Sequence, residues 1–152
     1  MNTLELKSIL LKQCSQFVAT RSEKILKTIK DIEYSLKEES KSTSGDKHHT
    51  GRAMLQIDRE HVGYQLKEIE KVKDQLQRVD ISSTSEVVRL GSIVSTNQAL
   101  FFISISVGKL EANNTVYLGI APNSPIGLCL LGKKVGDQLN FNGKIYKILK
   151  LE

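Results

Sequence analysis

A short polar segment, residues 39–51, carries the side chains of this chain that are best suited to metal chemistry. It reads Glu-Ser-Lys-Ser-Thr-Ser-Gly-Asp-Lys-His-His-Thr-Gly, without an aliphatic or aromatic side chain. The carboxylate of Asp46 is a hard oxygen ligand of the kind that Mg²⁺ prefers. Together with His48 and His49 it could instead hold a transition metal such as Zn²⁺, because imidazole suits such ions. The alternative is a solvent-exposed turn whose histidines bind no metal.

Charged residues on both sides of this segment extend the candidate site. Glu38 and Glu39 precede it and could add carboxylates from the other side of the turn. Lys47 and Arg52 make the segment mixed in charge rather than acidic. We therefore treat the three carboxylates as candidate catalytic groups, with Asp46 first, and Lys47, His48, His49 and Arg52 as candidate tip contacts.

Two helical patterns flank the polar segment and position it. Apolar residues recur there at alternating steps of three and four, which is the pattern of a coiled-coil seam: Leu11, Cys14, Val18, Ile25, Ile29, Ile32 and Leu36 before it, and Leu55, Val62, Leu66, Ile69, Val72, Leu76 and Val79 after it. Folding the chain back near Gly45 brings Ile29 opposite Val62. This predicts an antiparallel helical hairpin over 1–80 with its tip at about 38–52. A dimerisation device is the alternative, although a plain connection needs only about two to eight residues.

From Glu86 onwards the apolar pattern changes to a period of two, which predicts strands. We expect strands at 87–94, 100–107 and 115–120, and a hairpin of 139–141 with 145–149 around Asn142-Gly143. One short helix is expected in between, with Ser124 as its N-cap, Pro125 in its first position and Gly132 at its end. The fold class is therefore α+β, with a small antiparallel β domain over 81–152.

Composition describes a soluble, folded chain. Its 152 residues are 39% hydrophobic and 26% charged, with a formal net charge of +5. No apolar run approaches the roughly 18 residues of a membrane span, and the charged first residues do not resemble a signal peptide. We expect a cytoplasmic protein whose Cys14 and Cys129 stay reduced. The lysines at the C-terminal end form only a modest cluster, which does not by itself predict a nucleic-acid binder.

Four segments of the second half, taken in order and spacing, resemble the C-terminal domain of Gre-type bacterial transcription elongation factors. They are 88–94 with Gly91-Ser92, then Val107-Gly108 with Glu111-Ala112, then Asn123-Ser124-Pro125-Ile126-Gly127, and then Leu131-Gly132-Lys133-Lys134-Val135-Gly136-Asp137. A helical hairpin before this domain is also the layout of that family.

The resemblance implies an FKBP-like fold for the second half, docked on the rim of the RNA polymerase secondary channel through Ser124, Pro125 and Ile126. The hairpin would enter the channel, where Asp46 would share a Mg²⁺ ion held by the polymerase and stimulate cleavage of backtracked RNA. The factor itself would be a monomer without a stably bound cofactor and no enzyme. It would meet nucleic acid only within the transcription complex and would bind no membrane.

The tip departs from the pattern of that family at one position. Gre factors carry an Asp-x-x-Glu pair, and the residue three after Asp46 here is His49. A neutral imidazole is a poor ligand for Mg²⁺, so a polymerase regulator that does not stimulate cleavage is a second hypothesis. A metal-binding or coiled-coil interaction protein unrelated to polymerase is a third. A prolyl isomerase is a fourth, and the few aromatic residues of the second half argue against it.

Overall fold

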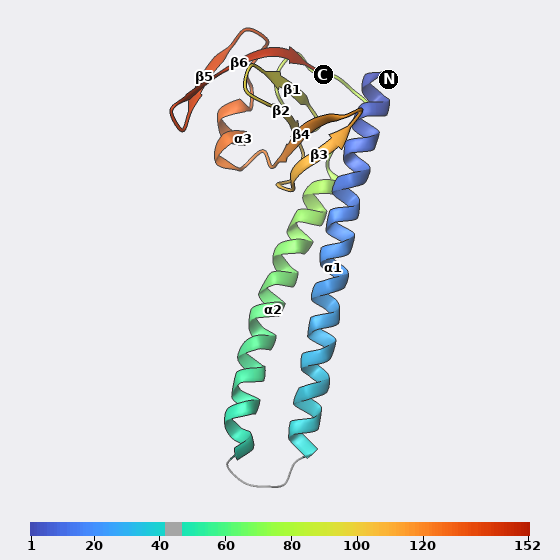
Figure 1. The fold of residues 1–152 in the computed structure, drawn as a ribbon, viewed down its shortest axis with the longest axis vertical. Coiled ribbons are helices and arrows are strands. Elements are labelled where there is room, and N and C mark those ends of the chain that lie inside the picture. Colours follow the sequence, from blue (N-terminus) through green and yellow to red (C-terminus); the bar gives the residue numbers. More distant parts are fainter. Residues whose placement is uncertain (42–46) are drawn as a thin grey trace. The chain divides into compact units, whose positions relative to one another are not determined.

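The computed structural model describes residues 1–41 and 47–152, and the side chains of 47–50 lie outside the described part. The chain divides into two compact units (Figure 1). The β unit comprises Met1–Phe17 and Asp74–Glu152, and the helical unit comprises Val18–Lys73. Helix α1 (Thr3–Lys41) and helix α2 (Lys47–Gln77) each contribute to both units. The boundary at residue 80 stays a prediction.

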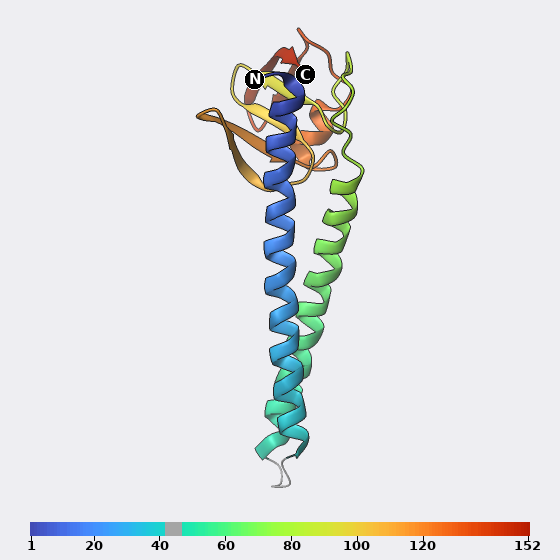
Figure 2. The same ribbon diagram turned by 90° about the vertical axis from the view of Figure 1, so that its right-hand side faces the viewer.

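The helical unit is the predicted antiparallel hairpin (Figure 2). Its buried side chains are those of the predicted stripes, among them Ile25 and Ile29 of α1 and Val62 and Ile69 of α2. An ion pair crosses between the helices, with Arg59 Nε 3.2 Å from Glu33 Oε1. The pair Glu33–Arg59 lies one residue away from the pairing obtained by folding the chain back near Gly45. In the part of the chain that the structure describes, no helix is both long and apolar enough to cross a membrane.

Both helices extend into the region predicted as the tip. Helix α1 continues to Lys41 and helix α2 begins at Lys47, so much of 38–52 is helical. Side-chain bonds add to the contacts near the end of α1. The carbonyl oxygen of Leu36 accepts a hydrogen bond from Ser40 Oγ of the same helix at 3.0 Å and one from Arg52 Nη1 of α2 at 3.1 Å. The second bond joins the two helices next to the tip.

The described part of the β unit contains a six-stranded sheet in the order β3-β4-β2-β1-β6-β5. Its strands are β1 (Ile93–Thr96), β2 (Leu100–Ile103), β3 (Gly108–Ala112), β4 (Thr115–Ile120), β5 (Gln138–Phe141) and β6 (Lys144–Leu151). Neighbouring strands are antiparallel except for the pair β2–β4, which is parallel. Helix α3 (Pro125–Leu130) connects β4 to β5. The chain is therefore an α+β protein, as predicted.

Two strand predictions needed correction, one strand was missed, and two predictions were confirmed. The predicted strand 87–94 begins only at Ile93, because Gly91 has a positive φ of 95° and Arg89 to Ser92 form a turn. The predicted strand 100–107 ends at Ile103. Strand β3 was not predicted at all. The strand at 115–120 and the hairpin at Asn142-Gly143, both residues with positive φ, match the prediction.

Side chains cover both faces of the central strands. On one face, Val94, Phe101, Ile103, Leu130 and Ile148 form a buried cluster, against which further side chains of α3, β5 and β6 pack. On the other, Ser104, directly after β2, meets the first part of α1, where Cys14 Sγ lies 3.7 Å from Ser104 Oγ. Burial on both faces explains why Leu100–Ile103 reads as a continuous apolar run. Cys14 and Cys129 are both free thiols, as expected.

Candidate functional site

The base of the hairpin tip holds two predicted carboxylates that face different surroundings. Glu38 is exposed, with its Oε1 3.5 Å from Lys41 Nζ one turn further along α1. Glu39 is half-buried, and its carboxylate lies close to Gly51 of α2. A Cβ atom added to Gly51 would be 3.6 Å from Glu39 Oε1. Successive side chains on a helix diverge by about 100°. Glu38 and Glu39 therefore leave α1 in different directions, and their role as cation ligands stays a prediction.

Arg52 also lies at this base, where it contacts helix α1. Its half-buried guanidinium donates to the carbonyl oxygen of Leu36 at 3.1 Å and to Ser40 Oγ. Arginine has five N–H donors, so these two bonds leave donors that could still meet a phosphate or carboxylate. Its most evident role is to join the two helices next to the tip.

The remaining tip residues have less structural description. Asp46, the first candidate catalytic carboxylate and Mg²⁺ ligand, lies outside the described residues. Lys47, His48 and His49 belong to the first turn of α2, and their side chains lie outside the described part. Among the described residues, no group of three or more His, Cys, Asp and Glu side chains could hold a metal ion.

The three residues predicted to dock on a partner lie at the start of α3 and have different roles. Ser124 is the N-cap: its Oγ accepts a hydrogen bond from Gly127 N at 3.1 Å and donates one to Ala121 O at 2.6 Å. Ile126 is half-buried and packs on the apolar cluster below. Pro125 is exposed, and so is Leu128, one turn later on the same face of the helix.

Leu128 is the member of this surface that sequence reasoning did not single out. Its side chain is 63% exposed. Ile126 and Leu130 pack on the core, whereas Leu128 lies at a different angle around the helix and faces away from it. Pro125 and Leu128 therefore form the exposed apolar part of the predicted docking surface.

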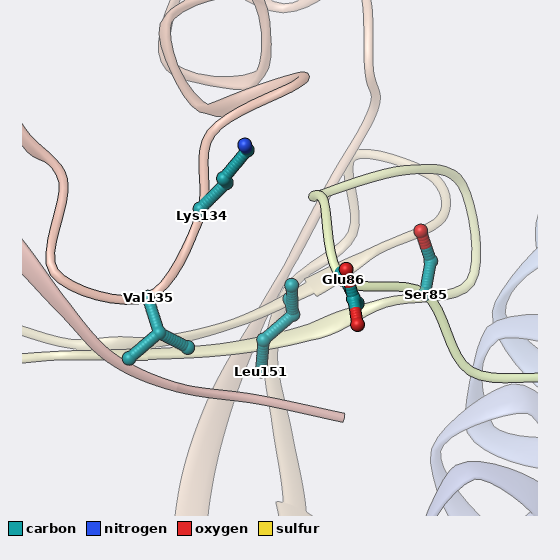
Figure 3. Close-up of a pocket in the computed structure, with 5 residues that line it drawn as sticks. All are labelled: Ser85, Glu86, Lys134, Val135 and Leu151. Carbon is teal, nitrogen blue, oxygen red and sulfur yellow. The ribbon is translucent and has the colours of Figure 1, made fainter.

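An open hollow of about 350 Å³ lies elsewhere on the β unit (Figure 3). Ser85, Glu86, Lys134, Val135 and Leu151 line it, and they come from three separate segments of the chain. The hollow offers a carboxylate, an ammonium group and an apolar wall. No sequence motif predicts this hollow, because its walls come from segments that are distant in the sequence. Long-range backbone hydrogen bonds, such as that from Val88 N to Lys133 O at 2.8 Å, bring these segments together.

A buried lysine distinguishes the side of the β unit where α1 packs. Lys7 is almost fully buried, and burial lowers its pKa below the ordinary value, with the positive charge of Arg89 adding to the effect. The carboxylates of Glu152 and Asp80 act in the opposite direction. Thr3 Oγ1 donates to Glu152 Oε1 at 2.8 Å, which holds the carboxylate at this end of α1.

Comparison with known proteins gives a likeness in structure and none in sequence. No family model and no curated protein matches the sequence. The solved structure of the transcription factor Gfh1 is similar over 94% of this chain and 93% of that chain, with 18% sequence identity and a TM-score of 0.34. The fold assignment rests on the helices and strands described above.

Proposed function

We propose that this chain is a regulator of transcription that binds bacterial RNA polymerase. In this proposal the β unit docks on the rim of the secondary channel, and the α1–α2 hairpin reaches into the channel. The observation that carries the proposal is the structural role of the residues that resemble Gre factors. The β unit needs these residues for its fold, so the resemblance concerns residues that determine the structure of this unit.

Backbone contacts give this argument its detail. The first and last resembling segments are joined by two hydrogen bonds, from Val88 N to Lys133 O at 2.8 Å and from Gly132 N to Val88 O at 2.9 Å. In the third segment, a Cβ on Gly127 would lie 2.1 Å from Ala121 O, so that only glycine fits. Residues under such constraints are those that a shared fold retains.

Binding to core RNA polymerase is the first test of this proposal. We expect Pro125→Ala combined with Leu128→Ser to weaken binding at least tenfold, because both side chains are exposed and neither is part of the core. Ile145→Ser with Leu149→Ser is the matched control, since these β6 side chains are 56% and 55% exposed. A wild-type chain that does not bind core polymerase contradicts the proposal. Equal loss of binding in the control contradicts the docking surface.

We further propose that the chain does not by itself stimulate RNA cleavage strongly. Between Ser40 and Gly51 the sequence has one acidic residue, Asp46. Glu38 lies beside Lys41, and Glu39 lies against α2. A single carboxylate is a weaker ligand for Mg²⁺ than the pair that Gre factors carry.

Backtracked transcription complexes test this second part. We expect little cleavage with the wild-type chain and a gain of at least tenfold with His49→Glu, which restores the second carboxylate. Combining His49→Glu with Asp46→Asn should remove the gain. Strong cleavage by the wild-type chain that survives Asp46→Asn would contradict a role for this carboxylate.

A further inference from the structure

Four exposed side chains on helix α2 form a line that does not take part in the packing between α1 and α2. Met54, Ile57 and Tyr64 are 62%, 64% and 64% exposed, and the fourth member, His61, is exposed as well. Their spacing of three, four and three residues is that of a coiled-coil seam. We call Met54, Ile57, His61 and Tyr64 the outer stripe.

The outer stripe is separate from the seam between the two helices. The α2 side of that seam consists of Leu55, Val62, Leu66 and Ile69, which are buried or half-buried. At about 100° per residue, the centres of the two stripes lie roughly 130° apart around the helix. Single exposed apolar residues are normal on a protein surface, but a contiguous row of them marks an interaction site.

The charges beside the outer stripe are acidic on both sides. Asp58 and Glu60 each lie roughly 80° from the middle of the stripe, in opposite directions around the helix. Arg59, the base between them in sequence, lies on the other side of α2, where its Nε is 3.2 Å from Glu33 Oε1. A chain with a formal net charge of +5 thus presents here a row of three apolar side chains and one histidine with acidic borders.

We infer that the outer stripe binds an amphipathic helix of another protein whose apolar seam is bordered by lysine or arginine. An apolar row at helical spacing packs well against a second helix. The acidic borders select a partner with basic borders, because opposite charges across an interface favour binding and like charges oppose it. This inference goes beyond the proposed function: the outer stripe lies on the hairpin, but it includes no residue of the tip or of α3, and its binding of a helix does not depend on entry into the channel.

A second copy of this chain is a poorer occupant of the same face. In an antiparallel pair, Asp58 faces its own copy and Glu60 faces its own copy, and both contacts are repulsive. In a parallel pair, Asp58 faces Ala53 and Glu60 faces Gln65, so that no cation is offered. Neither arrangement brings a basic residue to the acidic borders of the outer stripe.

The test measures binding of two labelled helical peptides to the full-length chain by fluorescence anisotropy. Both peptides carry the same leucine seam, one with lysine at its borders and one with glutamate. We expect the lysine peptide to bind at least ten times more tightly. Ile57→Asn with Tyr64→Asn should weaken its binding at least tenfold. Leu26→Asn with Tyr34→Asn, which removes apolar side chains of α1 that are 52% and 66% exposed, should leave it unchanged.

A charge reversal keeps the test decisive if an apolar variant loses helical structure. Asp58→Lys with Glu60→Lys should reverse the preference, so that the glutamate peptide binds more tightly. Equal binding of both peptides, or no binding of the lysine peptide to the wild-type chain, overturns the inference. Self-association in sedimentation velocity that Ile57→Asn with Tyr64→Asn abolishes would make the second copy the occupant and would also overturn it.

Discussion

At the scale of single residues, the turn before β1 depends on Gly91. Its φ of 95° lies in the left-handed region, and a Cβ there would lie 2.3 Å from Asp80 O. Asp80 is itself fixed, since its Oδ1 accepts hydrogen bonds from Ser82 Oγ at 2.5 Å and Ser82 N at 2.9 Å. These bonds hold the pKa of the Asp80 carboxyl below its usual range. The loop 80–92 therefore has a defined conformation although it contains no strand.

Replacing Gly91 by alanine should destabilise the β unit by about 3 kcal/mol or more, since backbone strain and a steric clash act together. Gly132→Ala is the matched control: Gly132 has a φ of 79°, but nothing lies within 4 Å of its Cβ position. Strain alone should cost about 1–2 kcal/mol there. Urea denaturation measures both changes, and equal losses would show that the contact with Asp80 does not matter.

Lys7 gives a second prediction at this scale. Its pKa in the folded chain lies below the ordinary value of 10.5, because burial and the charge of Arg89 disfavour the ammonium form. Between the two pKa values the unfolded chain binds more protons, so the free energy of unfolding rises with pH across that window. Protonated Lys7 is thus a cost at neutral pH, and it is relieved as the pH rises towards 10.5.

Lys7→Met should therefore raise the free energy of unfolding at neutral pH by about 1 kcal/mol. It should also flatten the rise in stability between neutral pH and about pH 10. Lys12→Met, at an exposed position of the same helix, should change stability by less than about 0.5 kcal/mol. Urea denaturation over that pH range provides the measurement. A loss of stability in Lys7→Met would mean that its attraction to Glu152 and Asp80 outweighs its burial.

At the scale of elements, the side chain of Gln13 protects the edge strand β3. Gln13 Nε2 donates to Glu111 O at 2.5 Å, and Glu111 N donates to Gln13 Oε1 at 3.0 Å. The amide thus forms the two bonds that a neighbouring strand would form. Unpaired edges are prone to pair with other chains, and covering them prevents this. The contact also holds the first part of α1 on the sheet within the β unit.

Removing this amide should expose the edge of β3. Gln13→Ala should lower the free energy of unfolding by about 1–2 kcal/mol, the cost of two lost hydrogen bonds. Hydrogen exchange at the Glu111 amide should become faster. Gln16→Ala, one turn later at an exposed position, should change neither quantity. An unchanged exchange rate at Glu111 in Gln13→Ala would contradict the protective role.

The helices could be predicted from the sequence more reliably than the strands, for a physical reason. The seam that contains Ile25 and Ile29 of α1 and Val62 and Ile69 of α2 can be recognised within each helix alone. Its apolar residues recur there at steps of three and four. Strand β3 carries exposed Lys109 and Glu111 and becomes a strand through its partner β4, to which Gly108–Ala112 is fully paired. The turn Asn113-Asn114 connects the two strands and makes this pairing possible, with positive φ values of 52° and 57°. The sequence analysis did not recognise these two asparagines as a turn.

At the scale of the whole molecule, the candidate site was predicted by residue type and not by arrangement. The sequence named Glu38, Glu39 and Arg52, but only the structure separates the exposed carboxylate from the half-buried one and joins Arg52 to α1. The outer stripe escaped prediction because each helix was assigned one apolar face. In a helix with two apolar faces, the face that packs against the neighbouring helix must be located first. Only then can the other face be recognised as exposed.

The two units lead to the last prediction, which concerns how the chain opens. The helical unit is held by one seam, whereas the β unit has a sheet with both faces covered. Ile29 and Ile148 are buried in the helical and β units, at 7% and 0% exposure. Truncating either to alanine should cost about 2–5 kcal/mol, which raises exchange rates by roughly thirtyfold or more where opening is governed by that unit.

Hydrogen exchange followed along the chain distinguishes the units. Ile29→Ala should speed exchange within 18–73 and leave β1, β2 and β6 close to wild type. Ile148→Ala should do the reverse. The two substitutions are chemically identical, so that a difference in pattern reflects their location. If each variant speeds exchange equally in both units, the chain opens as one cooperative structure, and the hairpin then derives its stability from the β unit as well as from its own seam.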